Sequence, residues 1–190
     1  MTRTIEYQAR SQRGFSLIDT MVTLSVTGIV GSMATMQVGT MRRLMQGDGA
    51  MRVVMAQLNT ARELAITQRR NMEIKFVGTN WLQIVRIEVP SGTTVLTNVA
   101  LEGNAKYALV SGIADTPEGF GNSSAISFGS AASIMFGTDG TFIDSNGVPI
   151  NGTVFLSVAN VPESLRAVTV LGATGRVRSY RWNGNAWTRV

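Results

Sequence analysis

The residue types best suited to chemistry gather near the C-terminus, in the stretch GRVRSYRW (175–182). A β-strand would place Arg176 and Arg178 on one face, about 6.6 Å apart, with Val177 toward the core. Paired guanidinium groups beside aromatic rings suit phosphate contact and base stacking. The same charges also suit a solvated edge strand or contact with a neighbouring subunit. The further members of this candidate DNA-binding site are Tyr180, Arg181 and Trp182, with Arg189 adding charge nearby.

A second candidate is Asp19, the single charged residue between Phe15 and Met41. As a helix this stretch would be about 40 Å long, which exceeds the ~30 Å hydrocarbon core of a bilayer. A carboxylate inside such a segment costs about 2.5–3.5 kcal/mol on insertion scales. We therefore expect a membrane-spanning helix whose acid has a function, the alternatives being an acid at headgroup level or a buried core helix.

The polar, basic leader MTRTIEYQARSQRG (1–14) precedes the apolar stretch, and no small-residue cleavage site follows that stretch. A natural boundary for cleavage is Gly14/Phe15, which would leave the apolar segment on the mature chain. Asp19 would then be the fifth residue and could pair with the new α-amino group, within one chain or between neighbouring chains.

Composition excludes several classes of function. The 190 residues include no cysteine and no histidine, and the formal net charge is +5. Disulfides, thiolate or imidazole metal sites and Ser-His-Asp catalysis are therefore excluded, and no phosphate-binding glycine loop occurs. We expect no enzyme activity, no cofactor and no metal. The stretches 139–140 and 144–147 could hint at a calcium loop, but their Asp, Asn and Gly residues favour turns.

The elements that would position these groups follow from periodicity. Gly47-Asp48-Gly49 predicts a kink or short break. Residues 51–70 return to a helical period, with an apolar stripe that would face a globular domain. The members of that stripe are Met51, Val54, Leu58, Ala61 and Ala65.

From residue 71 the pattern changes to a period of two, typical of antiparallel strands. Residues 102–124 are rich in Gly and Ser, and we predict a loop there. Strands are expected at 72–77, 81–89, 93–101, 125–128, 133–136, 141–143, 153–159, 165–171 and 176–182. The organisation is then a leader (1–14), an apolar helix (15–46), an amphipathic half (47–70) and a β-rich domain (71–190), which is an α+β class.

The stretch RGFSLID (13–19) resembles the processing site of type IV prepilins and type II secretion pseudopilins. The resemblance implies that a prepilin peptidase cuts after Gly14 and N-methylates Phe15. The acid at this place in the family is usually Glu and is taken to neutralise the N-terminal amine of an adjacent subunit. Asp19 keeps the charge but has a shorter reach, which fits a minor subunit better than a major one.

The stretches LNTARELAITQRR (58–70), GTDGTF (137–142) and GRVRSYRW (175–182), with the strand pair between, resemble the GspH/FimT branch of pilin-like proteins. The resemblance implies a long N-terminal helix and a C-terminal domain of two antiparallel sheets. It implies a low-abundance subunit at or near the tip of a type IV pilus or type II secretion pseudopilus, which helps to initiate assembly.

The same resemblance implies partners and a location. The partners would be other pilin subunits, the prepilin peptidase and the inner membrane, spanned once with the globular domain in the periplasm before assembly into a filament. In FimT-like members a similar arginine motif is associated with DNA binding in natural transformation. The alternative function is therefore a DNA receptor that uses Arg176 and Arg178.

Overall fold

The computed structural model describes residues 16–190, apart from the side chains of residues 34–37. The predicted cleavage residues Gly14 and Phe15 lie outside this range. The chain divides into two units at Thr40/Met41, and each unit is described by itself. The first helix, α1 (Leu17–Gln68), contributes to both units.

In the first unit, the described apolar side chains of α1 up to Thr40 are exposed on the surface. Five of the described hydroxyl groups in this part of the helix donate to backbone carbonyls of the same helix, those of Thr20, Thr23, Ser25, Thr27 and Ser32. For example, Thr23 Oγ1 donates to the carbonyl of Asp19 at 2.8 Å, and Thr27 Oγ1 donates to the carbonyl of Thr23 at 2.7 Å. Hydroxyls bonded in this way present little polar surface. The helix is long and apolar enough to cross a membrane.

In the second unit, α1 remains helical through Gly47-Asp48-Gly49, so the predicted break is wrong. Gly47 serves close packing against backbone, whereas Gly49 faces the carboxylate end of the Glu102 side chain. A Cβ added at Gly47 would lie 2.7 Å from the carbonyl oxygen of Ser164, and one at Gly49 would contact the carboxylate of Glu102. Tertiary packing therefore outweighs the low helix propensity of glycine here.

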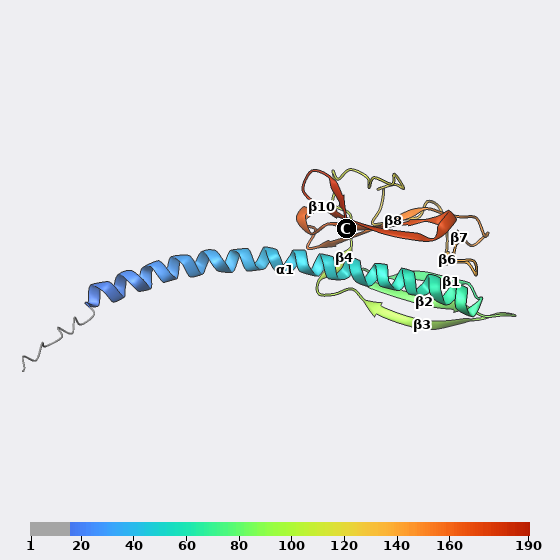
Figure 1. Ribbon diagram of the computed structural model, residues 1–190, viewed down its shortest axis with the longest axis horizontal. Coiled ribbons are helices and arrows are strands. Elements are labelled where there is room, and N and C mark those ends of the chain that lie inside the picture. Colours follow the sequence, from blue (N-terminus) through green and yellow to red (C-terminus); the bar gives the residue numbers. More distant parts are fainter. Residues whose placement is uncertain (1–15) are drawn as a thin grey trace, which may run out of the picture. The chain divides into compact units, whose positions relative to one another are not determined.

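Two antiparallel sheets follow the helix, and the predicted α+β class is confirmed (Figure 1). Sheet A has the strand order β3-β2-β1-β6-β7, and sheet B the order β11-β10-β9-β8-β4, with β5 also paired to β8. The strands of sheet A are β1 (Met72–Val77), β2 (Trp81–Ile87), β3 (Thr93–Ala100), β6 (Ile134–Phe136) and β7 (Phe142–Asp144). Those of sheet B are β4 (Ala105–Tyr107), β5 (Ile126–Ser127), β8 (Gly152–Val158), β9 (Arg166–Leu171), β10 (Arg176–Trp182) and β11 (Trp187–Arg189).

Two strands were not expected from the sequence. The predicted loop 102–124 contains β4, and β11 follows a turn after β10. Each is three residues long, too short for a period of two to be visible. Two 3₁₀ turns, η1 (Pro162–Ser164) and η2 (Gly172–Thr174), flank β9.

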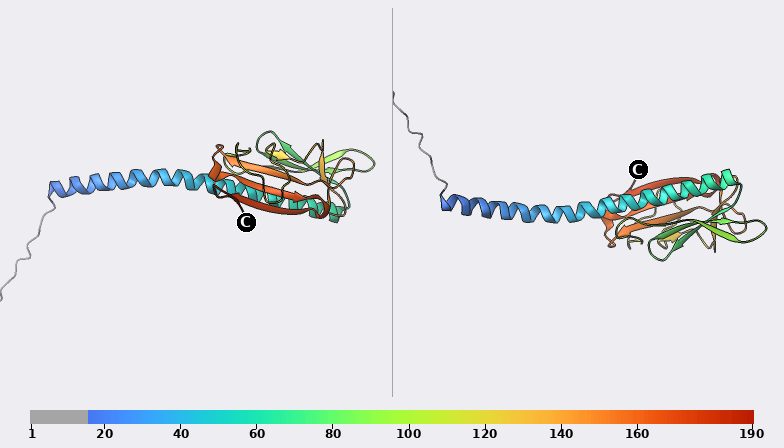
Figure 2. Two further views of the ribbon diagram at one scale, coloured as in Figure 1. Left: turned by 90° about the horizontal axis from the view of Figure 1, so that it is seen from above. Right: turned by 90° about the horizontal axis from the view of Figure 1, so that it is seen from below.

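Within the second unit, α1 lies beside the two sheets (Figures 1 and 2). One cluster of buried apolar side chains, here called the helix-side cluster, joins the helix to both sheets. The predicted apolar stripe of the helix is confirmed, because all five of its residues are buried there. Every residue of β8 is buried. The helix-side cluster covers one face of sheet B. A smaller cluster around Phe155, here called the outer cluster, covers the opposite, outer face of that sheet.

The terminal strands of the two sheets, taken in the strand orders above, differ in length and charge. The edges β4, β7 and β11 have three residues each, and each includes one charged residue: Lys106, Asp144 or Arg189. The edge β3 has eight residues, TTVLTNVA, with no charge and no proline. The pairing of β3 with β2 is irregular at one place, where the register shifts and Leu96 has no partner residue in β2.

Candidate functional site

Three residues of β10 converge on one carboxylate, that of Glu118. The guanidinium of Arg178 donates a hydrogen bond to Oε1 and forms an ion pair with it. The hydroxyl of Tyr180 donates to the same oxygen at 2.9 Å, and Nη2 of Arg176 lies 3.8 Å from Oε2. The alternation of β10 therefore places these three side chains on one face, as expected, but the face is not open.

The loop that supplies Glu118 is fixed over the outer face of sheet B. Asp115 accepts hydrogen bonds from the backbone N–H groups of Thr116 at 2.6 Å and Gly121 at 2.7 Å. The indole N–H of Trp187 in β11 donates to the carbonyl of Ala114 at 2.8 Å. These bonds hold the loop in a defined place although it has little regular structure, and so they aim Glu118 at β10.

The charges in this cluster stabilise one another. Burial alone would raise the pKa of Glu118, but hydrogen bonds from Arg178 and Tyr180 outweigh it and the net pKa is lowered. Burial, followed by the hydrogen bond to Glu118, raises the pKa of Tyr180. Two guanidinium groups and one carboxylate leave the cluster with one formal positive charge. Nε of Arg178 is buried and has no hydrogen-bond partner in the described part of the chain.

The aromatic members of the predicted DNA site are buried. Tyr180 is 4% and Trp182 is 7% exposed. Tyr180 packs with Phe155 in the outer cluster of sheet B, and the ring of Trp182 meets that of Trp187 edge-on, with centroids 5.3 Å apart. Base stacking on either ring would require the ring to leave this packing.

Arg181 lies on the other face of β10 and contacts the helix. Its Nη2 is 2.7 Å from Oδ2 of Asp48, while Nε of Arg166 is 2.6 Å from Oδ1 of the same carboxylate. Arg166 and Arg181 are direct cross-strand partners of β9 and β10. Two like charges at such positions repel, and the carboxylate between them removes that repulsion.

Arg166 is the most deeply buried charge of the described residues, at 1% exposure. Its Nη1 donates to the carbonyls of Glu163 and Leu165, both at 2.9 Å, and its Nη2 to that of Leu44 at 3.4 Å. Sequence reasoning missed this Asp48–Arg166–Arg181 cluster. The available signals were an arginine at the start of the apolar strand LRAVTVL (165–171) and an aspartate between two glycines in an otherwise apolar-striped helix.

Asp139 and Asp144 hold turns, as predicted. Asp139 accepts from the hydroxyl of Thr141 at 2.6 Å and from its backbone N–H at 3.0 Å, and these bonds lower the pKa of Asp139. Asp144 accepts from the backbone N–H of Val148 at 2.9 Å, the main cause of its lowered pKa. Within residues 16–190, no group of three or more Asp, Glu, Cys or His residues could hold a metal ion.

Asp19 is exposed in the first turn of α1, where a carboxylate is favourable to the helix dipole. No described residue donates a hydrogen bond to its side chain, although its backbone carbonyl accepts from Thr23. The carboxylate is therefore available to a group outside the described residues or outside this chain. Asp19 belongs to the first unit, and the arginine clusters belong to the second.

Comparisons of this chain with protein-family models, with curated proteins and with solved structures found no match.

Proposed function

We propose that this chain is a minor pilin or pseudopilin, a structural subunit of a type IV pilus or type II secretion pseudopilus. The observation that carries the proposal is the exposed apolar part of α1, with one acid near its start, in a chain whose remainder is a well-packed β-rich unit. The resemblance of residues 13–19 to a prepilin processing site and of the later stretches to the GspH/FimT branch supports the same proposal.

The physical logic is a helix that exchanges one apolar environment for another. Before assembly the segment would lie in the inner membrane, with the β-rich unit in the periplasm. In a filament the same side chains would contact neighbouring helices. Lipid tails and helix surfaces are similarly apolar, so this exchange costs little. The hydroxyls bonded within the helix require no new partners in either place.

Asp19 would give the assembly its direction. A carboxylate in an apolar surrounding is costly unless it is paired, and the α-amino group of a chain that begins at Phe15 is a suitable cation. The pair would form between neighbouring subunits near the start of each helix. This contact would set the axial position of one subunit against the next.

The decisive experiment compares Asp19 variants for insertion and for assembly in cells that make the filament. We expect Asp19→Ala to reach the membrane fraction at the level of the unchanged chain but to enter sheared filaments poorly. Asp19→Glu should assemble, and Thr20→Ala is the matched neighbour control. Normal incorporation of Asp19→Ala would remove the proposed role of this residue.

Processing supplies an independent test of the same proposal. Mass spectrometry of the mature chain should find N-methylated Phe15 as the first residue. Gly14→Leu should leave the leader attached. A mature N-terminus at another residue, or assembly of the uncleaved chain, would contradict the proposal.

DNA capture is the second candidate, favoured by the half-exposed guanidinium groups of Arg176 and Arg181 and by the positive charge left on each cluster. It ranks second because Glu118 and Asp48 already occupy these groups. If the chain binds duplex DNA, the binding should be weak, independent of sequence and strongly reduced by salt.

A further inference from the structure

The strand β1 has a neighbour on both sides along only part of its length. Its pairing with β2 covers all six residues, Met72–Val77. Its pairing with β6 ends at Ile74, which is opposite Ile134. The backbone of residues 75–77 therefore has no strand beside it on the β6 side among the described residues. Unpaired backbone groups at a strand edge can pair with another extended chain.

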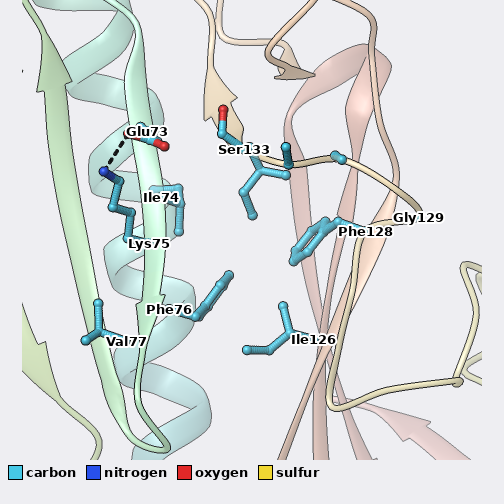
Figure 3. Close-up of a pocket in the computed structure, with 12 residues that line it drawn as sticks. Glu73, Ile74, Lys75, Phe76, Val77, Ile126, Phe128, Gly129 and Ser133 are labelled. Carbon is cyan, nitrogen blue, oxygen red and sulfur yellow. Dashed lines mark ion pairs between the residues drawn. The ribbon is translucent and has the colours of Figure 1, made fainter.

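A groove with a volume of about 580 Å³ opens beside these three residues (Figure 3). Its far wall is the segment 126–134. Ile74 and Phe76 of β1 point across the groove toward Ile126 and Phe128 (Figure 3). The rings of Phe76 and Phe128 are stacked with centroids 6.1 Å apart, so the floor of the groove is apolar.

The groove exists because the chain before β6 leaves the sheet. If β6 continued in register, residues 131–133 would lie opposite residues 75–77. Instead, Gly129 has a positive φ of 62° and the N–H of Ala131 donates to the carbonyl of Phe128 at 3.4 Å. This turn holds residues 131–133 on the far wall, and the place of a strand beside β1 is left open.

We propose that this groove binds an extended peptide segment of a partner protein, which adds to sheet A beside residues 75–77. Three residues in a strand extend about 10 Å, so the open edge fits a short segment. Backbone hydrogen bonds to β1 would supply part of the affinity, and the apolar floor would select the side chain placed on it. The inference is independent of whether the chain assembles into a filament.

The side chains of β1 define the partner's chemistry. The ring of Phe76 forms part of the apolar floor of the groove, so the partner residue that pairs with Phe76 is apolar. Lys75 and Val77 face outward, and the residues opposite them are acidic and apolar respectively. Nζ of Lys75 is 3.1 Å from Glu73, but the lysine side chain is 45% exposed and the glutamate 15%, so the ammonium is the accessible charge. An antiparallel segment would read apolar, apolar, acidic in its own direction.

The test uses the full chain in detergent micelles and a fluorescent peptide, acetyl-Ser-Val-Leu-Glu-Ser-amide, with binding followed by anisotropy. We expect saturable binding. Two further peptides carry an N-methyl group at Leu or at Glu. Because adjacent N–H groups of a strand point to opposite sides, one methylated peptide should lose at least tenfold in affinity while the other stays within twofold. An equal effect of the two methyl groups, or no saturable binding, would overturn the proposal.

Protein variants locate the binding in the groove. Ala132 is exposed on the far wall, so Ala132→Trp should fill the groove without disturbing the core and weaken binding at least tenfold. Ala173→Trp, exposed in η2, is the matched control. Unchanged binding by a folded Ala132→Trp variant would overturn the assignment, and the methylated peptides test the unaltered chain if that variant does not fold.

Charge exchange tests the chemistry assigned to the partner. Lys75→Glu should weaken the peptide about two- to fivefold, and a peptide with Lys in place of Glu should restore the affinity. Lys106→Glu, on β4 of the other sheet, should have no effect. Should the chain instead self-associate through the groove, seen as a dimer that Ala132→Trp dissociates and that no peptide displaces, the occupant is a second copy and the proposal of a partner segment is wrong.

Discussion

Replacing Asp48 with Ala should destabilise the β-rich unit by about 3 kcal/mol. The substitution leaves the guanidinium of Arg166 almost fully buried without its carboxylate partner. Removing one partner of a buried ion pair lowers the free energy of unfolding by about 3–5 kcal/mol. The backbone carbonyls of Glu163 and Leu165 still accept hydrogen bonds from Arg166, so we expect the lower end of this range.

Two further variants separate burial of charge from surface electrostatics. Asp48→Asn keeps the size of the side chain and an acceptor oxygen but removes the charge, and it should cost less than Asp48→Ala. Arg181→Gln removes the other partner of the same carboxylate. The side chain of Arg181 is 46% exposed, and exposed ion pairs contribute about 1 kcal/mol or less.

The assay is unfolding of the full chain in a mild detergent, followed by tryptophan fluorescence. All three tryptophans, Trp81, Trp182 and Trp187, lie in the second unit, so the signal reports that unit alone. For a unit of this size a loss of about 3 kcal/mol corresponds to a fall in Tm of about 6–12 °C. If Asp48→Ala lowers Tm by less than about 2 °C, or if Arg181→Gln lowers it equally, the reasoning that burial of Arg166 makes its contact with Asp48 important is refuted.

The other predictions use the same assay or a binding titration. Gly47→Ala should destabilise the β-rich unit by about 1–3 kcal/mol, because the added methyl group meets a backbone carbonyl. Gly49→Ala should be neutral or stabilise the unit by up to about 1 kcal/mol, because its methyl group meets the movable end of a side chain. Equal effects of the two substitutions on stability would contradict the packing argument. The pKa of Glu118 is lowered from its ordinary value of 4.5 in the folded chain. The ionised carboxylate therefore stabilises the folded chain fully above pH 4.5, and this contribution is lost as pH falls through the folded-state pKa. Glu118→Gln should therefore be less stable than the unchanged chain at pH 7, with a difference that narrows below pH 4.5; a constant difference would argue against the ionised contact. If the chain binds DNA, Glu118→Gln should raise the affinity and Arg176→Gln with Arg178→Gln should abolish it, and a titration in which neither change alters binding would exclude this surface.

Local patterns predicted most of the fold. The helical stripe and the long strands have periods that are visible over six or more residues, and each was found where the sequence placed it. The break at Gly47-Asp48-Gly49 was wrong because glycine propensity is a local quantity, whereas the carbonyl of Ser164 packs against Gly47 from over a hundred residues away in the chain.

The candidate site was predicted only in part, for the same reason. Alternation correctly grouped Arg176, Arg178 and Tyr180 on one face. The carboxylate that they share belongs to Glu118, about sixty residues earlier in a loop without periodicity. Sequence spacing cannot show which long-range acid reaches a basic strand, and so it could not show that the exposed arginine motif is already paired.

The uncharged edge β3 has a practical consequence for anyone who handles this protein at high concentration. Charged residues on the other three edges discourage the joining of sheets from different molecules, and β3 lacks that protection apart from its single irregularity in register. Aggregation in concentrated solution should therefore begin along this strand. Lysine in place of the exposed Val95 would be the least intrusive gatekeeper against precipitation.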